Sequence, residues 1–173
     1  MQRKLPIFIT VGLLFAVLGL YFGVNRIAPA TPKVRASASL LAQTWPDARG
    51  TPQKLSQWEN KPLIVNFWAT WCAPCIQEMP ELSALQTELA PKGIQLIGIG
   101  IDSAANITAF ASKYKISYPL YAAGIDGTDL SRSFGNQAGG LPFTVLIGRD
   151  GQVKKTYLGR LKMQDLRADL ALM

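Results

Sequence analysis

Both cysteines of this 173-residue chain lie in the short segment Trp71-Cys72-Ala73-Pro74-Cys75. Two thiols separated by two residues can close a small disulfide ring with little backbone movement where a chain turns into a helix. Such a pair is typical of reversible exchange, in which a thiolate attacks a disulfide and a second thiol resolves the mixed disulfide. The sequence therefore predicts two-electron redox chemistry at Cys72 and Cys75.

The segments around the cysteine pair favour a strand before it and a helix after it. Residues 63–68 form an apolar, strand-forming run, and after the pair leucines recur at helical spacing as far as Leu89. At a helix start, the unpaired N–H groups and the helix dipole favour negative charge. We therefore expect Cys72 to be the nucleophile, with a pKa below the ordinary thiol value of about 8.5. Cys75, one turn onward, should be less exposed and act as the resolving thiol.

Other uses of two close cysteines can be compared with the composition. A structural zinc ion needs about four Cys or His ligands, whereas the chain has two cysteines and no histidine. Covalent haem attachment needs a histidine directly after the second cysteine, and Ile76 stands there. We therefore expect neither a metal nor a cofactor. A purely structural disulfide stays open as an alternative, although so short a loop constrains the unfolded chain far less than a long one.

The amino-terminal part of the chain has the pattern of a membrane anchor. The 20 residues from Leu5 to Val24 include no charged side chain, and as a helix they would span about 30 Å, the thickness of the hydrocarbon core. Arg3 and Lys4 precede the run, which favours a cytoplasmic amino terminus. Residues 1–25 are therefore predicted to form a transmembrane helix, with the globular part outside the cytoplasm.

A cleaved signal peptide is the alternative for the same segment. Ala28-Pro29-Ala30 or Ala36-Ser37-Ala38 could mimic the small residues of a cleavage site. The apolar core of a signal peptide is usually only about 7 to 15 residues long, however. The longer run in this chain favours an anchor that is kept.

The formal net charge of +7 is concentrated near the predicted anchor. Residues 1–35 hold five basic residues and no acidic one, and the other 13 basic residues nearly balance 11 acidic residues. The basic excess therefore flanks the membrane segment and does not predict a nucleic-acid partner. Two cysteines in a single motif also argue against a small scaffold held by several disulfides.

Residues 26–39, rich in proline, alanine and serine, are predicted to be a linker, and residues 40–173 a single folded domain. Alternating strands and helices that end in a hairpin and a helix predict an α/β fold with a mixed central sheet and helices on both faces. We expect strands at 40–45, 63–68, 94–101, 118–122, 143–147 and 153–158, and helices at 55–58, 73–90, 103–114, 127–134 and 163–170.

Two segments carry a resemblance to a known family. Residues 65–80, Val-Asn-Phe-Trp-Ala-Thr-Trp-Cys-Ala-Pro-Cys-Ile-Gln-Glu-Met-Pro, together with residues 140–144, Gly-Leu-Pro-Phe-Thr, resemble the thioredoxin superfamily. More narrowly, they are similar to its membrane-tethered TlpA/ResA/CcmG-type thiol-disulfide oxidoreductases. The resemblance covers roughly residues 40–173 and implies a thioredoxin-like fold.

The resemblance also implies a docking site for protein partners. The family's proline at the position of Pro142 is cis and lies beside the redox pair, where the adjoining backbone can pair with an extended peptide; an ordinary trans loop proline is the alternative. Trp71, Pro74, Leu141 and Phe143 are then expected to contact a partner. For Trp71, packing in the core is an equal alternative. Phe143 departs from the small polar residue common in relatives, which leaves the shape of the groove open.

Glu78 is the candidate for moving protons at the pair. Thioredoxin carries a buried aspartate six residues before its first cysteine, whereas this chain has Asn66, which cannot titrate. Glu78 lies three residues beyond Cys75 and matches the acidic position of the Cys-x-x-Cys-x-x-Glu-x-Pro pattern in the ResA-like branch. Partial burial would raise its pKa toward neutrality, where a carboxyl exchanges protons readily. A solvated surface glutamate is the alternative.

Together these observations predict a protein thiol-disulfide oxidoreductase of the bacterial cytoplasmic membrane, single-pass, with its soluble domain facing the periplasm. In an oxidising compartment, where stronger oxidants normally form disulfides, a dedicated disulfide reductase is expected. The resemblance implies clients such as apocytochrome c or metal-site thiols, and electrons drawn from a membrane dithiol donor. The alternatives are a net thiol oxidase or isomerase of the same fold, and a copper-delivery chaperone. The motif by itself does not choose the direction of exchange.

Overall fold

The computed structural model describes residues 12–21 and 32–172, and the chain divides into two compact units, residues 1–31 and 32–173. In the first unit residues 12–21 are helical. The rest of the predicted anchor over residues 1–25 lies outside the described residues. Among the residues that are described, no helix is both long and apolar enough to cross a bilayer. The anchor therefore stays a prediction.

The second unit begins earlier than the sequence predicted. Helix α2, Pro32–Leu41, lies within the predicted linker over residues 26–39. Ala36 and Leu40 of this helix are buried at 2% and 0% exposure in one of the two core clusters. The linker assignment is therefore wrong for residues 32–39, because small and apolar residues four positions apart give the helix a face that packs on the domain. The predicted strand over residues 40–45 is correspondingly shorter and later.

A five-stranded mixed sheet forms the centre of the domain, with strand order β5-β4-β3-β6-β7. The middle strand β3 pairs in parallel with β4, which pairs in parallel with β5, and antiparallel with β6, which forms a hairpin with β7. The bounds are β3 Leu63–Trp68, β4 Gln95–Gly100, β5 Leu120–Ala122, β6 Phe143–Ile147 and β7 Val153–Leu158. The predicted mixed sheet is confirmed.

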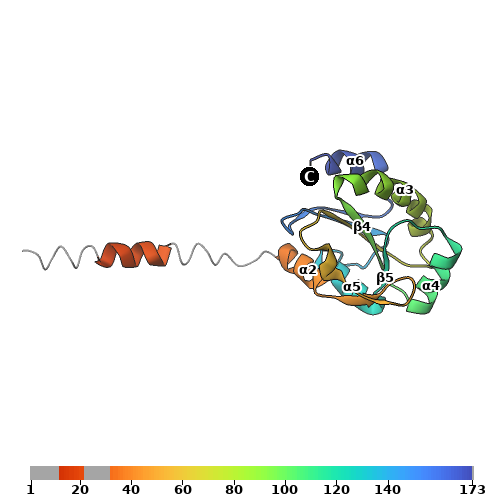
Figure 1. Cartoon of the computed structure of the whole chain (residues 1–173), viewed down its shortest axis with the longest axis horizontal. Coiled ribbons are helices and arrows are strands. Elements are labelled where there is room, and N and C mark those ends of the chain that lie inside the picture. Colours follow the sequence, from red (N-terminus) through yellow and green to blue (C-terminus); the bar gives the residue numbers. More distant parts are fainter. Residues whose placement is uncertain (1–11, 22–31, 173) are drawn as a thin grey trace, which may run out of the picture. The chain divides into compact units, whose positions relative to one another are not determined.

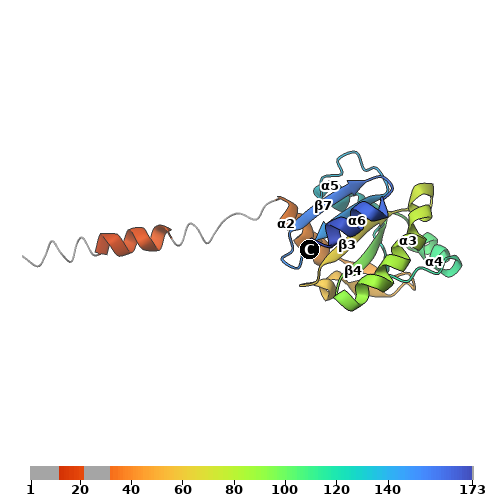
Figure 2. The ribbon, with the colours of Figure 1, turned by 90° about the horizontal axis from the view of Figure 1, so that it is seen from above.

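Helices cover both faces of this sheet (Figures 1 and 2). One core cluster joins the sheet to α3, α4 and α6, and the other joins it to α2 and α5. Their bounds are α3 Ala73–Leu89, α4 Ala104–Lys113, α5 Gly124–Ser133 and α6 Met163–Leu170, and the smaller elements are β1 Thr44–Pro46, β2 Pro52–Lys54, η1 Leu55–Trp58 and η2 Ala90–Lys92. The predicted sheet with helices on both faces is therefore present, and it agrees with the thioredoxin-like fold that the resemblance implied.

Strand β3 leads directly to the cysteine pair and is buried on both faces along its whole length. Its side chains alternate, so that Ile64 and Trp68 enter the cluster under α3, and Val65 and Phe67 enter the cluster on the other side. Asn66, between Val65 and Phe67, therefore projects toward the face that α3 covers. A buried polar side chain in a central strand needs hydrogen-bond partners, which the site supplies.

Candidate active site

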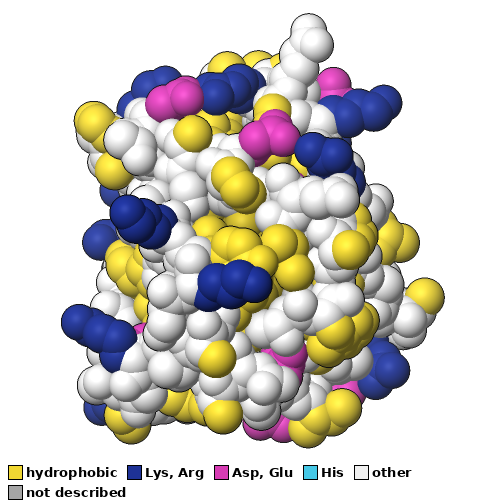
Figure 3. Space-filling model, turned by 90° about the vertical axis from the view of Figure 1, so that its right-hand side faces the viewer, with side chains coloured by type: hydrophobic (Ala, Val, Ile, Leu, Met, Phe, Trp, Pro, Cys, Tyr) yellow, Lys and Arg dark blue, Asp and Glu magenta, His cyan; other side chains and the backbone are white. Residues whose placement is uncertain are grey.

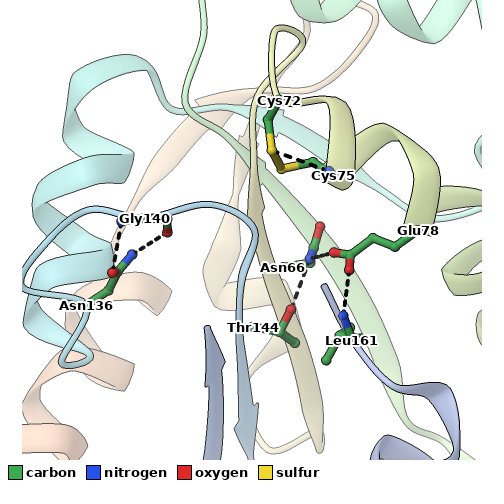
Figure 4. The surroundings of a disulfide bond; sticks show 8 residues. All are labelled: Asn66, Cys72, Cys75, Glu78, Asn136, Gly140, Thr144 and Leu161. Atoms are coloured by element: carbon green, nitrogen blue, oxygen red, sulfur yellow. Dashed lines mark hydrogen bonds between the residues drawn. A yellow bond between two sulfur atoms is a disulfide. The ribbon is translucent and has the colours of Figure 1, made fainter. Parts of the chain in front are cut away.

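Cys72 and Cys75 form a disulfide where the chain passes from β3 into α3 (Figure 4). The two Cα atoms lie 5.3 Å apart. Cys72 is the residue that caps α3, and its Sγ accepts a hydrogen bond from the Cys75 N–H at 3.3 Å. Cys72 is 5% exposed and Cys75 is fully buried. The expected order of exposure, with Cys75 less accessible, is therefore confirmed.

The start of α3 favours negative charge on the Cys72 sulfur. Its first turn contains no acidic residue, and Pro74 there supplies no N–H that would need a partner. The Cys75 N–H already points at Cys72 Sγ. Because this N–H group and the helix dipole act on the same atom, a thiolate formed at Cys72 on reduction is stabilised electrostatically.

Pro142 lies at the end of the sheet from which the cysteine motif emerges. The Leu141–Pro142 peptide bond is cis, as the family resemblance implied. Antiparallel pairing sets Phe143 opposite Phe67, near the end of β3. The loop before β6 therefore lies at the same end of the sheet as the carboxyl end of β3, where the chain continues to Cys72. Pro142 is buried, and Leu141 is half-buried.

The four residues expected to contact a partner differ in exposure: Trp71 and Pro74 are exposed, Leu141 is half-buried and Phe143 is buried. Trp71 is 70% exposed, and Pro74 is exposed, so both side chains are available beside the disulfide. Phe143 is only 3% exposed, and its ring lies 5.9 Å from that of Phe67 in the cluster on the other side of the sheet. A docking role for the Phe143 side chain is therefore wrong, because its register opposite Phe67 turns it away from the face that holds the cysteines.

Glu78 is fully buried beneath the pair, on α3, three residues after Cys75 (Figure 4). Its Oε1 accepts a hydrogen bond from Asn66 Nδ2 at 2.9 Å, and its Oε2 accepts one from the Leu161 N–H at 3.0 Å. Burial raises the pKa of this carboxyl, and the two hydrogen bonds oppose that rise in part. The alternative of a solvated surface glutamate is wrong.

The sequence did not predict two residues that bind Asn66 and Glu78 in this buried network. Asn66 Nδ2 also donates to Thr144 Oγ1 at 3.0 Å, across 78 residues of sequence. The Leu161 N–H reaches Glu78 across 83 residues. Thr144 stands opposite Asn66 in the β3–β6 register, so a correct strand pairing could have found it. Leu161 contributes only its backbone N–H to this contact, so its residue type gives no signal in the sequence.

The arrangement can perform reversible thiol–disulfide exchange. A capped, positively polarised helix start stabilises a thiolate at Cys72, and Cys75 is held within bonding distance behind it. A buried carboxyl with a raised pKa lies on the same helix one turn beyond Cys75. Such a carboxyl can hold a proton at a pH where a surface carboxyl has lost it.

Comparison with known proteins gives consistent matches. A family model described as Redoxin matches residues 30–170. The thiol-disulfide oxidoreductase ResA of Geobacillus thermodenitrificans is 30% identical over 126 residues, which cover 72% of this chain and 70% of that protein. The thioredoxin-like protein YneN of Bacillus subtilis is 28% identical over 127 residues, covering 71% of each. A solved thiol:disulfide interchange protein of Chlorobium tepidum superposes with a TM-score of 0.63 at 26% identity, covering 75% of this chain and 91% of that one.

Proposed function

The chain belongs to the Redoxin family and, within it, to the ResA-like thiol-disulfide oxidoreductases, and we propose that it reduces disulfides of protein partners outside the cytoplasm. The observation that carries the proposal is the Cys72–Cys75 disulfide at the start of α3. The reduced pair is the form that acts on a partner, and the disulfide is the product of one cycle.

In the proposed cycle the Cys72 thiolate attacks one sulfur of a partner disulfide. A Cys72–partner bond forms, and the other partner sulfur leaves as a thiolate. Cys75 then gives its proton to Glu78 and attacks Cys72, so that the Cys72–Cys75 bond forms and the second partner sulfur leaves. The partner gains two electrons and the pair loses two. Burial of Glu78 and its place one turn beyond Cys75 support this proton transfer.

The reductive direction is supported by the chemistry of the proposed compartment. Outside the cytoplasm, disulfides are normally formed by dedicated strong oxidants. A separate thiol-disulfide oxidoreductase such as this chain is therefore better suited to reducing disulfides. Apocytochrome c or the thiols of metal sites are suitable clients, because cysteines that must bind haem or metal have to be reduced first. Electrons would come from a dithiol donor in the membrane.

We place the domain on the periplasmic side of a bacterial cytoplasmic membrane, tethered through residues 1–25. The uncharged run from Leu5 to Val24 and the preceding Arg3 and Lys4 support this placement. Fractionation of cells that produce the full chain, followed by protease treatment of spheroplasts, would test it. Recovery of the chain in the soluble cytoplasmic fraction would contradict the placement.

The direction of exchange is tested by the reduction potential of the pair. Equilibration of the full chain with glutathione or dithiothreitol buffers gives this potential from the fraction of Cys72 and Cys75 that an alkylating reagent can modify. A value well below about −200 mV is expected for a reductase, whereas a value near about −120 mV would assign the chain to thiol oxidation.

Trp71 is expected to contribute to partner binding and little to stability. Figure 3 shows the side of the domain on which α4 lies in Figure 1, and hydrophobic side chains gather near the middle of this face with basic side chains around them. Replacing Trp71, 70% exposed, with alanine should lower kcat/KM for a protein disulfide by about tenfold, chiefly through KM, because exposed aromatic residues dominate binding surfaces. The midpoint of thermal unfolding should stay nearly unchanged.

Leu172 offers the matched control for this substitution. It is 87% exposed and follows α6, whose Arg167 forms an ion pair with Glu88 near the opposite end of α3 from the cysteines. The Leu172→Ala variant should keep the parent kcat/KM. Equal losses in the two variants would show that Trp71 has no specific role in docking.

A further inference from the structure

The side-chain amide of Asn66 is buried and has partners on only one side. Its Nδ2 donates to Glu78 Oε1 at 2.9 Å and to Thr144 Oγ1 at 3.0 Å. Its Oδ1 is buried and has no hydrogen-bond partner within the described parts of the chain. An unpaired buried acceptor is uncommon in folded proteins and calls for an explanation. The proposed proton transfer offers one.

The observed orientation suits an ionised Glu78. A carboxylate can only accept hydrogen bonds, and both of its oxygens do so here, one from Asn66 and one from the Leu161 N–H. The amide can turn over by rotation about its Cβ–Cγ bond, which exchanges the positions of Oδ1 and Nδ2. Such a turn would bring the Asn66 oxygen against the carboxylate, and two acceptors would repel each other. The negative charge on Glu78 therefore holds the amide nitrogen toward itself and leaves Oδ1 unpaired.

The unpaired side of the amide faces the cysteines. Asn66 projects from β3 toward the face whose core cluster contains Cys72 and Cys75. In Figure 4 Nδ2 lies on the side of Glu78 and Thr144, whereas Oδ1 points toward the disulfide. An amide turned over in place would therefore present its two N–H donors to the side on which the cysteine sulfurs lie.

Protonation of Glu78 would reverse the preference of the amide. A neutral carboxyl carries an O–H that must donate, and the Thr144 hydroxyl can donate as well as accept. Oδ1, brought to the present position of Nδ2, would accept from both groups. The turned Nδ2 would then have no partner unless a negative charge formed on the side of the cysteines.

We propose that Asn66 is a positioning residue whose amide turns over when a proton passes between Cys75 and Glu78, so that its N–H groups face whichever of the two is charged. This inference rests on the proposed function. The proton leaves Cys75 Sγ and arrives on Glu78 Oε1, no electron moves, and Asn66 itself gains and loses nothing. The resulting Cys75 thiolate, held by the amide, then attacks Cys72 in the mixed disulfide.

Other charged groups change the pKa of Glu78 without replacing its hydrogen bond to Asn66. Arg160 lowers the pKa of Glu78 and Glu81 raises it, and these two residues form a half-exposed ion pair with each other. Tyr118 is buried, and the charge of Glu78 contributes to raising the pKa of its phenol. Tyr118 therefore stays protonated while Glu78 and Cys75 exchange their proton.

Nuclear magnetic resonance of the unaltered full chain tests the turn directly. In the oxidised protein, the Asn66 side-chain N–H protons should show Overhauser contacts to Thr144. In the reduced protein, at a pH where Cys75 is ionised, these contacts should be replaced by contacts to the Cys75 β-protons. Asn136 is an internal reference, because its Nδ2 donates to the Gly140 carbonyl and its Oδ1 accepts from the Gly140 N–H. Its amide should not turn. Asn66 contacts that stay on Thr144 in every state would overturn the inference.

A titration of Cys75 provides a second test. In the Cys72→Ser background, thiolate absorbance in the ultraviolet reports the pKa of Cys75 alone. Adding Asn66→Leu should raise this pKa, so that about tenfold less thiolate is present at a given pH. The control Gln86→Leu removes a different buried side-chain amide, on α3, whose oxygen accepts from the Leu96 N–H, and it should leave the pKa of Cys75 unchanged.

The two tests separate this inference from the proposed function. An unchanged Cys75 pKa in the Asn66→Leu variant, or an equal shift in the Gln86→Leu variant, would overturn the role of Asn66. Thiol–disulfide exchange by the unaltered chain could persist in that case. If the Asn66→Leu variant does not fold, the Overhauser contacts of the unaltered chain still decide.

Discussion

Replacing Cys72 with serine should abolish thiol–disulfide exchange, whereas replacing Cys75 with serine should stop the reaction at a mixed disulfide. Cys72 caps α3 and is the sulfur to which the helix start directs an N–H group. Loss of a covalent nucleophile should reduce the rate of partner reduction by at least about 1,000-fold. Loss of Cys75 leaves the first attack intact and removes only the fully buried resolving thiol.

Non-reducing electrophoresis and mass spectrometry of the captured species distinguish these outcomes. Cys75→Ser should accumulate adducts joined through Cys72, and the proteins found in them would identify the clients. Cys72→Ser serves as the matched control, because it keeps one cysteine in the same motif. Equal capture by both variants would show that the assignment of nucleophile and resolving thiol is wrong.

The elements that carry the cysteines could be predicted because several sequence signals agree there. Residues 63–68 are apolar and strand-forming, and the helix after them keeps its leucine spacing up to Leu89, so β3 and α3 have nearly their predicted bounds. Helix α2 was missed because its alanines and serines also suit a linker. Only contact with the folded domain shows that Ala36 and Leu40 form a buried face.

The contacts of the site were harder to predict than its residues. The spacing of Cys72 and Cys75 at the start of one helix identifies the redox pair. Glu78 is identified by its place three residues beyond Cys75 together with the family resemblance. The roles of Thr144 and Phe143 depend on the register between β3 and β6, which places Thr144 beside Asn66 and turns Phe143 toward the opposite core cluster. Strand register follows from the packing of the whole sheet, so neighbouring residues in the sequence can end up with unrelated functions.

Replacing Glu78 with glutamine should slow exchange and stabilise the fold at the same time. Glutamine cannot take up the Cys75 proton, and loss of a general base typically costs about 100-fold or more in rate. The same change removes a buried group that is charged at high pH and whose pKa burial raises. Near neutral pH the variant should therefore unfold at a higher temperature than the parent.

The pH dependence of this stabilisation follows from the direction of the pKa shift. Below the ordinary carboxyl value of 4.5, folded and unfolded chains both hold the Glu78 proton, and parent and variant should be equally affected by pH. Above that value the unfolded chain releases the proton more readily than the folded chain does, so the parent loses stability as pH rises until the folded carboxyl ionises too. The advantage of Glu78→Gln should therefore grow from acid toward neutral pH.

Glu81→Gln is the matched control, because Glu81 lies on the same helix and is half-exposed in an ion pair with Arg160. The control makes the same change of charge without changing a buried group, and exposed pairs of this kind contribute little to stability. Its thermal unfolding and its rate of exchange should stay close to those of the parent. If Glu78→Gln matched Glu81→Gln in both measurements across the pH range, Glu78 would be neither a proton acceptor for Cys75 nor a buried charge that destabilises the fold.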